Sequence, residues 1–186
     1  MSSEIPKSWC PIMSSHGKKG KSQKILEKVK QKQDLSQIVN VDEKEIKLVI
    51  FTLHEDFFAF YSANIKEILT LEKINFVPGS PEYILGIANV RGDIESVMNI
   101  NGFLGFPPQP ESKENRVIIT SAQGIRTGIL VGSVEDVLDV PESSIQSPLA
   151  TLHENIKPFV IGEIIYKNHN VTLLNVDRIF EKIVTQ

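Results

Sequence analysis

The side chains best suited to metal binding or nucleophilic chemistry are few and widely separated in this sequence. The four histidines are His16, His54, His153 and His169, and no two are spaced three or four residues apart. None stands beside cysteines at the spacing of a zinc site. Cys10 is the only cysteine, so an internal disulfide is impossible, and we interpret it as a thiol in a reducing compartment. We therefore expect no metal site.

Serines and carboxylates are present without the partners that catalysis requires. Ser80 and Ser133 each follow a glycine, but the surrounding residues lack the pattern of a nucleophile on a sharp strand-to-helix turn. The acidic pairs Glu55-Asp56 and Glu135-Asp136 fall in predicted turns or on exposed faces, where such pairs are mostly solvated. The sequence thus predicts no catalytic residues, no cofactor and no enzyme.

The charge balance argues against binding to nucleic acid. Twenty Lys and Arg residues stand against 23 Asp and Glu residues, for a net charge of -3. Such a chain lacks the positive field that attracts phosphates. The aromatic residues gather between Phe51 and Tyr61 among apolar neighbours, which is typical of a core. A protein partner is the first expectation, and a small barrel that binds a small molecule or nucleic acid is the alternative.

The ends of the chain carry no membrane signal. The first 15 residues lack the apolar centre of a signal peptide, and no run approaches the roughly 20 apolar residues of a membrane helix. We expect a cytoplasmic protein with no direct membrane insertion. Residues 1–46 are rich in lysine, and we expect a basic N-terminal extension that is partly disordered or forms short helices.

One charged residue stands at a position suited to recognition. Arg91 and Gly92 lie between two predicted strands, Ile84 to Val90 and Ile94 to Ile100, at the tip of a hairpin. A guanidinium at a hairpin tip can present a planar fork of donors to a partner surface. The spacing fits a solvated loop cation equally well.

The elements that must position these residues are short strands. Lys47 to Leu53 and Phe57 to Tyr61 predict a first hairpin, because both runs are rich in β-branched and aromatic residues. Ile65, Ile68 and Leu69 predict a short apolar turn after it. The run Val176 to Val184 has apolar residues at helical spacing and predicts a C-terminal helix at about 176–184.

The sequence repeats itself in a way that predicts two equivalent halves. A shift of 69 residues lays Leu48-Val49-Ile50 on Val117-Ile118-Ile119 and Ile65–Leu69 on Val134–Leu138; a shift of 76 lays Gly86 on Gly162, Val97-Met98 on Leu173-Leu174 and Asn99–Asn101 on Asn175–Asp177. Short strands exposing open edges are usually closed into small barrels. We expect an all-β fold with short helices and two barrels on one core, the first mainly residues 47–105 and the second mainly 115–175.

An ordered series of segments in residues 47–183 resembles the CheW family of bacterial chemotaxis adaptors. The similar segments are Leu48 to Leu53, Ile65-Lys66-Glu67-Ile68, Ile87 to Ile94, Gly128 to Val131, Val134 to Leu138 and Ile161-Gly162-Glu163. The resemblance implies two SH3-like five-stranded β-barrels sharing a core and a non-enzymatic scaffold role. It also implies two partners: the regulatory domain of a CheA-type histidine kinase and the cytoplasmic tip of methyl-accepting chemoreceptors.

The resemblance also assigns candidate partner-binding residues. Carried onto matching positions, Asn89, Arg91 and Gly92, with Ile65 and Glu67, would lie at or near a receptor-binding groove between the barrels. Val134 and Val137 belong to the repeat-equivalent segment and are further candidates.

The sequence departs from the family at one stretch. The hairpin commonly continues as P-V-x-D-L-R in the family, where Ser96, Asn99 and Asn101 replace the proline, the acid and the arginine. This difference is consistent with a divergent member.

Overall fold

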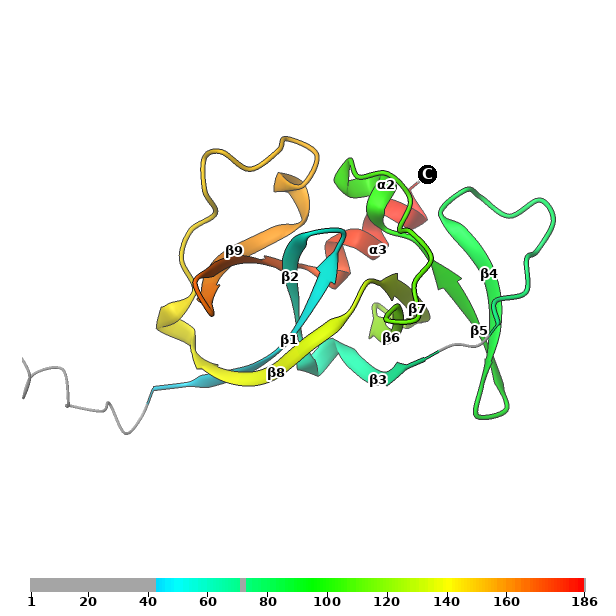
Figure 1. Ribbon diagram of the computed structural model, residues 1–186, viewed down its shortest axis with the longest axis horizontal. Helices are drawn as coiled ribbons and strands as arrows, with labels where there is room; N and C mark the ends of the chain where they lie inside the picture. The colour runs from blue at the N-terminus through cyan, green and yellow to red at the C-terminus, as the bar shows by residue number, and fades with distance from the viewer. Residues whose placement is uncertain (1–42, 71–72, 186) are drawn as a thin grey trace, which may run out of the picture. The chain divides into compact units, whose positions relative to one another are not determined.

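The computed structural model describes residues 43–70 and 73–185 (Figure 1). The basic extension expected for residues 1–46 therefore lies outside the described residues, apart from residues 43–46, as do Cys10 and His16. In the part of the chain that is described, no helix is long and apolar enough to cross a membrane.

The described chain is built mainly from ten strands. Their bounds are β1 Glu45–Leu53, β2 Asp56–Tyr61, β3 Ile65–Leu69, β4 Ile84–Val90, β5 Asp93–Met98, β6 Arg116–Ala122, β7 Ile125–Val131, β8 Val134–Pro141, β9 Val160–Tyr166 and β10 His169–Leu174. The helices are α2 Asn101–Leu104 and α3 Val176–Val184, and the 3-10 turns are η1 Ser62–Asn64, η2 Glu142–Ser144 and η3 Lys157–Phe159.

The strands form two five-stranded sheets in equivalent orders. The first sheet runs β8-β1-β2-β10-β9 and the second runs β3-β6-β7-β5-β4. The repeat shifts relate β1 to β6, β2 to β7 and β3 to β8 by 69 residues, and β4 to β9 and β5 to β10 by 76. Replacing each strand of the first sheet by its repeat equivalent gives the order of the second. The structure therefore contains the predicted internal repeat.

The repeats exchange strands, which differs from the expected division of the chain. Each sheet takes two strands from one repeat and three from the other, so residues 47–105 supply β1 and β2 to the first sheet and β3, β4 and β5 to the second. Figure 1 shows β1, β2, β8 and β9 on the left and β3 to β7 towards the right. The expected barrels of 47–105 and 115–175 do not match these sheets, because strand pattern marks where strands lie but not which strands they pair with.

Strand β3 also differs from expectation. The turn predicted at Ile65, Ile68 and Leu69 is a strand that pairs antiparallel with β6, with Ile68 opposite Ile118 and Leu69 opposite Val117. β3 is an edge strand of only five residues, and its apolar side chains are only partly buried. So short a strand leaves little alternation in the sequence, which is why the pattern did not predict it.

Paired details support the equivalence of the two sheets. Each contains one parallel pair, with Val97 opposite Gly128 in one sheet and Leu173 opposite Ala59 in the other. Each also has an isolated bridge from a preceding loop, Asn75 to Ile87 and Gln146 to Glu163. The strand residues of these contacts correspond by the repeat shifts, since Val97 and Leu173, and Ile87 and Glu163, are each 76 residues apart, and Ala59 and Gly128 are 69 apart.

The shared glycines of the repeat have a steric explanation. A Cβ on Gly86 would stand 2.2 Å from the backbone oxygen of Asn75, and one on Gly162 would stand 2.6 Å from that of Gln146. In both places the loop crosses so close to the strand that no side chain fits.

The buried apolar side chains form three clusters. One cluster lies within the first sheet and includes Leu48, Ala59 and Leu173. Another lies within the second and includes Val117 and Val97, which are the repeat equivalents of Leu48 and Leu173. Strands buried on both faces explain the uninterrupted apolar runs of the sequence.

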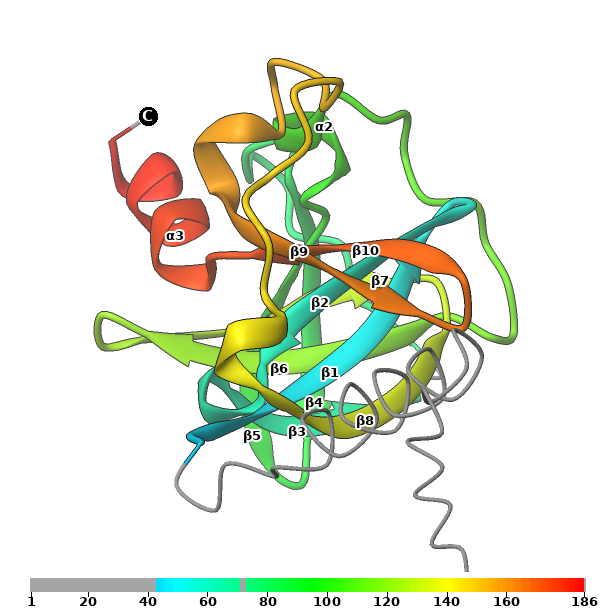
Figure 2. The ribbon, with the colours of Figure 1, turned by 90° about the vertical axis from the view of Figure 1, so that its left-hand side faces the viewer.

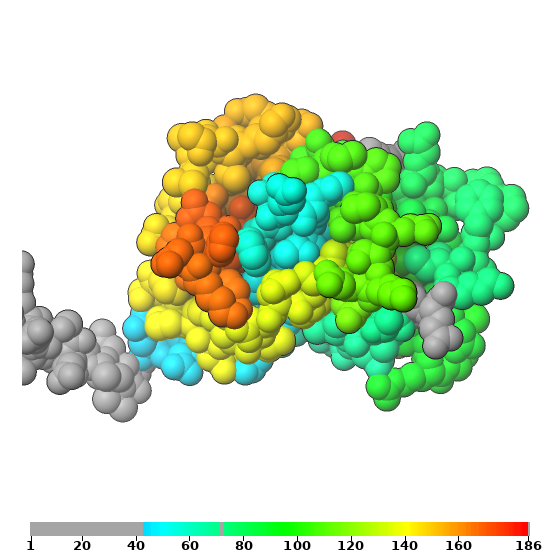
Figure 3. All heavy atoms as spheres, viewed as in Figure 1, coloured from blue at the N-terminus to red at the C-terminus, as the bar shows by residue number. Residues whose placement is uncertain are grey.

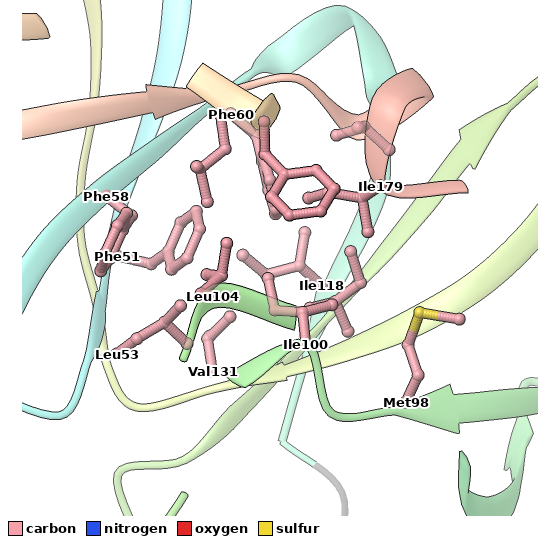
Figure 4. Close-up of a cluster of buried hydrophobic side chains, with 14 of the residues drawn as sticks. Phe51, Leu53, Phe58, Phe60, Met98, Ile100, Leu104, Ile118, Val131 and Ile179 are labelled. Carbon is pink, nitrogen blue, oxygen red and sulfur yellow. The ribbon is translucent and has the colours of Figure 1, made fainter. Parts of the chain in front are cut away.

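The largest cluster lies between the sheets and joins them into one body. Phe51, Phe58 and Phe60 enter from the first sheet, while Ile118 and Val131 enter from the second (Figure 4). Their rings and methyl groups are at most 2% exposed. The predicted fold class, all-β with short helices and two five-stranded units on a shared core, is confirmed.

Helix α3 covers one side of this shared core. It occupies Val176–Val184, the range expected from sequence (Figure 2). It buries Phe180 and Ile179 in the central cluster, and Figure 4 shows Ile179 there. The Asn175 side chain caps it by accepting a hydrogen bond from the backbone N–H of Arg178 at 3.2 Å.

Candidate functional site

The tip of the β4–β5 hairpin holds Arg91 in an unusual backbone conformation. Val90 pairs with Asp93, so Arg91 and Gly92 alone form the loop, and their φ angles are 54° and 102°. Two-residue loops with positive φ at both positions match the twist of the flanking strands. Asn89 stabilises the loop, since its Oδ1 accepts a hydrogen bond from the Gly92 N–H at 2.8 Å. Asn89 and Gly92 are thus positioning residues for the arginine.

The Arg91 guanidinium is directed by an ion pair. Its Nη2 contacts Oε1 of Glu67, which lies on β3 at the opposite edge of the same sheet. The sheet must therefore curl until its two edges approach, as in a closed barrel. The Arg91 side chain remains 80% exposed and that of Glu67 is 20% exposed. A guanidinium has five N–H donors, so one face of the fork stays available for a partner.

An exposed isoleucine lies beside this arginine and was not among the residues singled out from sequence. Ile94 stands directly opposite Asn89 in the β4–β5 ladder and is 63% exposed. An apolar side chain next to a charged fork is typical of interface anchors. The signal available in the sequence was its place just after the predicted tip, where it alternates with the buried Glu95 and Val97 along the strand.

The remaining sequence candidates divide into two groups. Ile65 lies two residues from Glu67 on β3 and packs against the central cluster. Val134 occupies the equivalent place on β8 and packs against the same cluster. Val137 is 49% exposed on β8, opposite Val49. The structure thus joins Asn89, Arg91, Gly92 and Glu67 by direct contacts, while the two valines lie on the edge strand of the other sheet.

The β9–β10 hairpin repeats this arrangement with different chemistry. Lys167 and Asn168 form its two-residue loop with φ angles of 46° and 67°. Lys167 corresponds to Arg91 and reaches Asp136 on β8, the equivalent of Glu67, at 3.9 Å between Nζ and Oδ2. Applying the two repeat shifts to Arg91 and Glu67 would have identified this pair from sequence.

The Asp136 carboxylate is held mainly by a tyrosine. The Tyr166 hydroxyl donates a hydrogen bond to its Oδ2 at 2.8 Å, and the Val137 N–H donates to its Oδ1 at 2.9 Å. These two hydrogen bonds lower the pKa of Asp136, with a smaller contribution from Lys167. Lys167 itself lies 4.6 Å from the centre of the Tyr166 ring, a cation–π contact.

The residues that depart from the family pattern have structural partners. The Ser96 hydroxyl lies 2.7 Å from that of Thr127. Asn99 Oδ1 accepts from the Asn101 N–H at 2.9 Å, and the buried Asn101 side chain donates to the Pro107 carbonyl at 3.1 Å. The polar stretch Ser96 to Asn101 therefore fixes the start of α2 and the loop after it.

The chemistry of these tips is that of binding. Within residues 43–70 and 73–185, no group of three or more His, Cys, Asp or Glu side chains is arranged to hold a metal ion. The two tips present exposed cations, a carboxylate partner for each, and exposed apolar side chains, which are features of protein interfaces.

Comparison with known proteins places this arrangement in context. Residues 47–184 match the profile of the CheW-like domain. The chain is 25% identical over 136 residues to chemotaxis protein CheW of Bacillus subtilis, covering 73% of this chain and 87% of that protein. It is 27% identical to CheW of Thermotoga maritima, covering 77% and 93%. The crystal structure of the scaffolding protein TtCheW from Thermoanaerobacter tengcongensis superposes with a TM-score of 0.65 at 28% identity, covering 74% of this chain and 94% of that one. The two curled sheets are accordingly SH3-like subdomains.

Proposed function

The chain belongs to the CheW-like domain family, and we propose that it couples chemoreceptors to a CheA-type histidine kinase in the cytoplasm. Proteins of this family are non-enzymatic scaffold adaptors, and this chain is a chemotaxis adaptor of the same kind. Its partners in the proposal are the cytoplasmic tip of a methyl-accepting receptor and the CheW-like regulatory domain of the kinase. Residues 47–183 carry the adaptor function, and the basic extension is dispensable for it.

The observation that supports this proposal is the construction of the Arg91 tip. A positive φ at a non-glycine residue is uncommon, and here Asn89, Gly92 and Glu67 all contribute to holding the arginine outward. Holding the side chain in advance lowers the entropy lost when it binds. We assign Arg91, with Ile94 beside it, to the receptor contact, and Ile65 to the floor of that surface.

The second half of the surface supplies a separate contact in the proposal. Val134 and Val137 lie on β8, the edge strand of the other sheet, and Val137 exposes an apolar side chain there. An adaptor must contact two partners at the same time, and two edges on different sheets meet this requirement without competition. We assign Val137 to the kinase contact and Val134 to its support from the core.

The test is reconstitution with purified components from the source organism. The full chain, a receptor cytoplasmic fragment and the kinase regulatory domain are mixed singly and together, and their complexes are measured by analytical ultracentrifugation. We expect each binary complex and a ternary complex, and we expect all three to survive deletion of residues 1–42. Failure of both binary complexes to form would contradict the proposed coupling.

A salt series separates this function from the alternative of polyanion binding. Affinity for nucleic acid carried by the lysine-rich extension would fall steeply with salt and disappear with the deletion. Binding of the receptor fragment that persists in both conditions supports the adaptor.

A further inference from the structure

A pocket of 340 Å³ lies beside the central apolar cluster, whose Phe58, Leu104 and Ile156 line it, and it is separate from the Arg91 tip. Four segments enclose it: residues 56–58 of β2, residues 104–106 at the end of α2, the loop 149–156, and the strands β9 and β10 at Glu163, Asn170 and Thr172. These segments adjoin one another on the face shown in Figure 3, where they are cyan, green, golden and orange. Its volume is at the lower end of the range for small-molecule sites.

The walls of the pocket are largely apolar. Phe57, Phe58 and Phe106 contribute aromatic rings, and Phe58 and Phe106 meet edge to face with their centres 5.9 Å apart. Leu104, Leu149, Leu152 and Ile156 complete the apolar lining. Gly105 closes against Asn155, whose amide nitrogen would lie 2.7 Å from an added Cβ. The pocket is therefore shaped by packed segments on several sides.

One carboxylate stands in this apolar lining. Glu163 is only 6% exposed, and among the described residues no hydrogen-bond donor or cation contacts its side-chain oxygens. It lies opposite Thr172, which is 8% exposed and lines the same pocket. Its oxygens are not sealed from water, so the carboxylate opens to the pocket and is available to a partner that enters it.

Other charges around the pocket do not neutralise this carboxylate. The remaining titratable residues of the lining are Asp56 at the rim and His153 in the covering loop, and the described lining contains no Lys or Arg. Lys157, which begins η3 directly after that loop, pairs instead with Glu154. The field in the pocket therefore favours a positively charged group.

The other repeat lacks this feature. The position equivalent to Glu163 is Ile87, which makes the corresponding bridge to a loop residue. An apolar residue thus fits this place in the fold, so the acid is not needed for strand pairing at that position.

We propose that this pocket binds a small organic amine, with its ammonium group on Glu163 and its apolar body among the phenylalanine rings. The carboxylate accepts hydrogen bonds from the ammonium, and Phe57, Phe58 and Phe106 add apolar and cation–π contacts. The site is independent of the adaptor contacts, because none of the residues assigned to receptor or kinase lines it.

The test uses phenethylamine as the probe and phenethyl alcohol as its uncharged isostere. Each is titrated to about 10 mM, a range that covers the weak affinity of so small a ligand, and amide shifts are followed by NMR on the full chain. We expect saturable shifts at residues 149–156 and 163–172 with the amine, and at least about tenfold weaker binding of the alcohol. Equal binding of the two probes, or no saturable shift, overturns the proposal and leaves a site for ordered water only.

Two variants assign the effect to the pocket. Glu163→Gln keeps the size of the side chain and should weaken amine binding about tenfold, while Glu154→Gln removes a nearby exposed charge and should leave it unchanged. Leu149→Trp should fill the pocket and abolish binding without touching the carboxylate. Unchanged affinity in either Glu163→Gln or Leu149→Trp, with the fold intact by thermal unfolding, overturns the assignment. A lysine dipeptide that binds where phenethylamine does not would also overturn it, because the occupant would then be a protein side chain.

Discussion

The β4–β5 and β9–β10 hairpins occupy equivalent places in the two sheets, yet they hold their cations differently. Arg91 contacts Glu67 directly, and Asn89 supports the loop through Gly92. Lys167 stands 3.9 Å from Asp136, whose Oδ2 already accepts a hydrogen bond from Tyr166. Arginine presents a rigid fork, whereas lysine is a flexible point charge. The same backbone thus carries one arginine in direct contact with its carboxylate and one lysine at a longer distance from its own.

Each tip also exposes one isoleucine opposite an asparagine, but the two residues stand on opposite strands in the two hairpins. In the first hairpin Asn89 faces Ile94, and in the second Ile165 faces Asn170. Both isoleucines are more than 60% exposed, at 63% for Ile94 and 62% for Ile165. Each tip therefore pairs one asparagine with one isoleucine, but only in the first does the asparagine precede the loop and bond to it. Local sequence order thus decides which tip gains a side-chain hydrogen bond across its loop.

The largest effect should come from the two glycines that the repeats share, because their surroundings differ between the sheets. Gly86→Ala should destabilise the protein by about 3 kcal/mol, because its φ is 147° and the new Cβ would meet a backbone oxygen. Gly162→Ala should cost about 2 kcal/mol, since one of its two close contacts is the movable Ile145 side chain. Urea unfolding measures both.

Gly124→Ala is the matched control for these glycines. Its φ is 77° but nothing lies within 4 Å of an added Cβ, so backbone strain alone should cost about 1 kcal/mol. Equal destabilisation by all three substitutions would contradict the steric explanation of the repeated glycines.

The next largest effect concerns affinity for the receptor fragment, which should depend on the Arg91 tip and not on the Lys167 tip. Arg91→Ala should weaken binding of the receptor fragment by more than about 1 kcal/mol, or about fivefold, because truncating an oriented anchor removes its contacts. Lys167→Ala, the equivalent change in the other sheet, should alter the same affinity by less than about twofold. Isothermal titration calorimetry measures both, and circular dichroism should show an unchanged fold. A larger loss in the lysine variant would reverse the assignment of the two tips.

The smallest effect concerns the electrostatics of the second tip. Tyr166→Phe removes the hydrogen bond that contributes most to the lowered pKa of Asp136, so this pKa should rise towards its ordinary value. A lowered native pKa stabilises the fold above the ordinary carboxyl pKa, and this contribution is lost as pH falls through the native value. NMR titration of the Asp136 carboxyl follows the change. An unaltered titration midpoint would show that Tyr166 is not the dominant partner.

Much of the architecture could be read from the sequence because a repeat leaves equivalent residues at fixed distances. The glycines at 86 and 162 and the asparagines at 99 and 175 were informative because strands do not favour them. The pairing of strands could not be read in the same way. Both repeats have the same apolar pattern, so β3, β4 and β5 fit either sheet equally well, and only the three-dimensional path of the chain decides between them.

The residues of the binding sites could be predicted from the sequence to different degrees. Arg91 was recognisable because a two-residue loop between strands fixes its place at a hairpin tip. Its contact with Glu67 joins opposite edges of a sheet and depends on curling that no local pattern encodes. Glu163 was read only as part of a similar segment, because its burial depends on a loop that begins after η2 and returns over β9.

The exchange of strands between repeats has a consequence for how the molecule can come apart. The two repeats are arranged like the subunits of a domain-swapped dimer, except that a single chain contains both. A cut in the connection between α2 and β6 would leave neither fragment with a complete sheet. Each fragment should be unstructured alone, and mixing the two should restore the fold, as the halves of an interlocked pair reassemble only together.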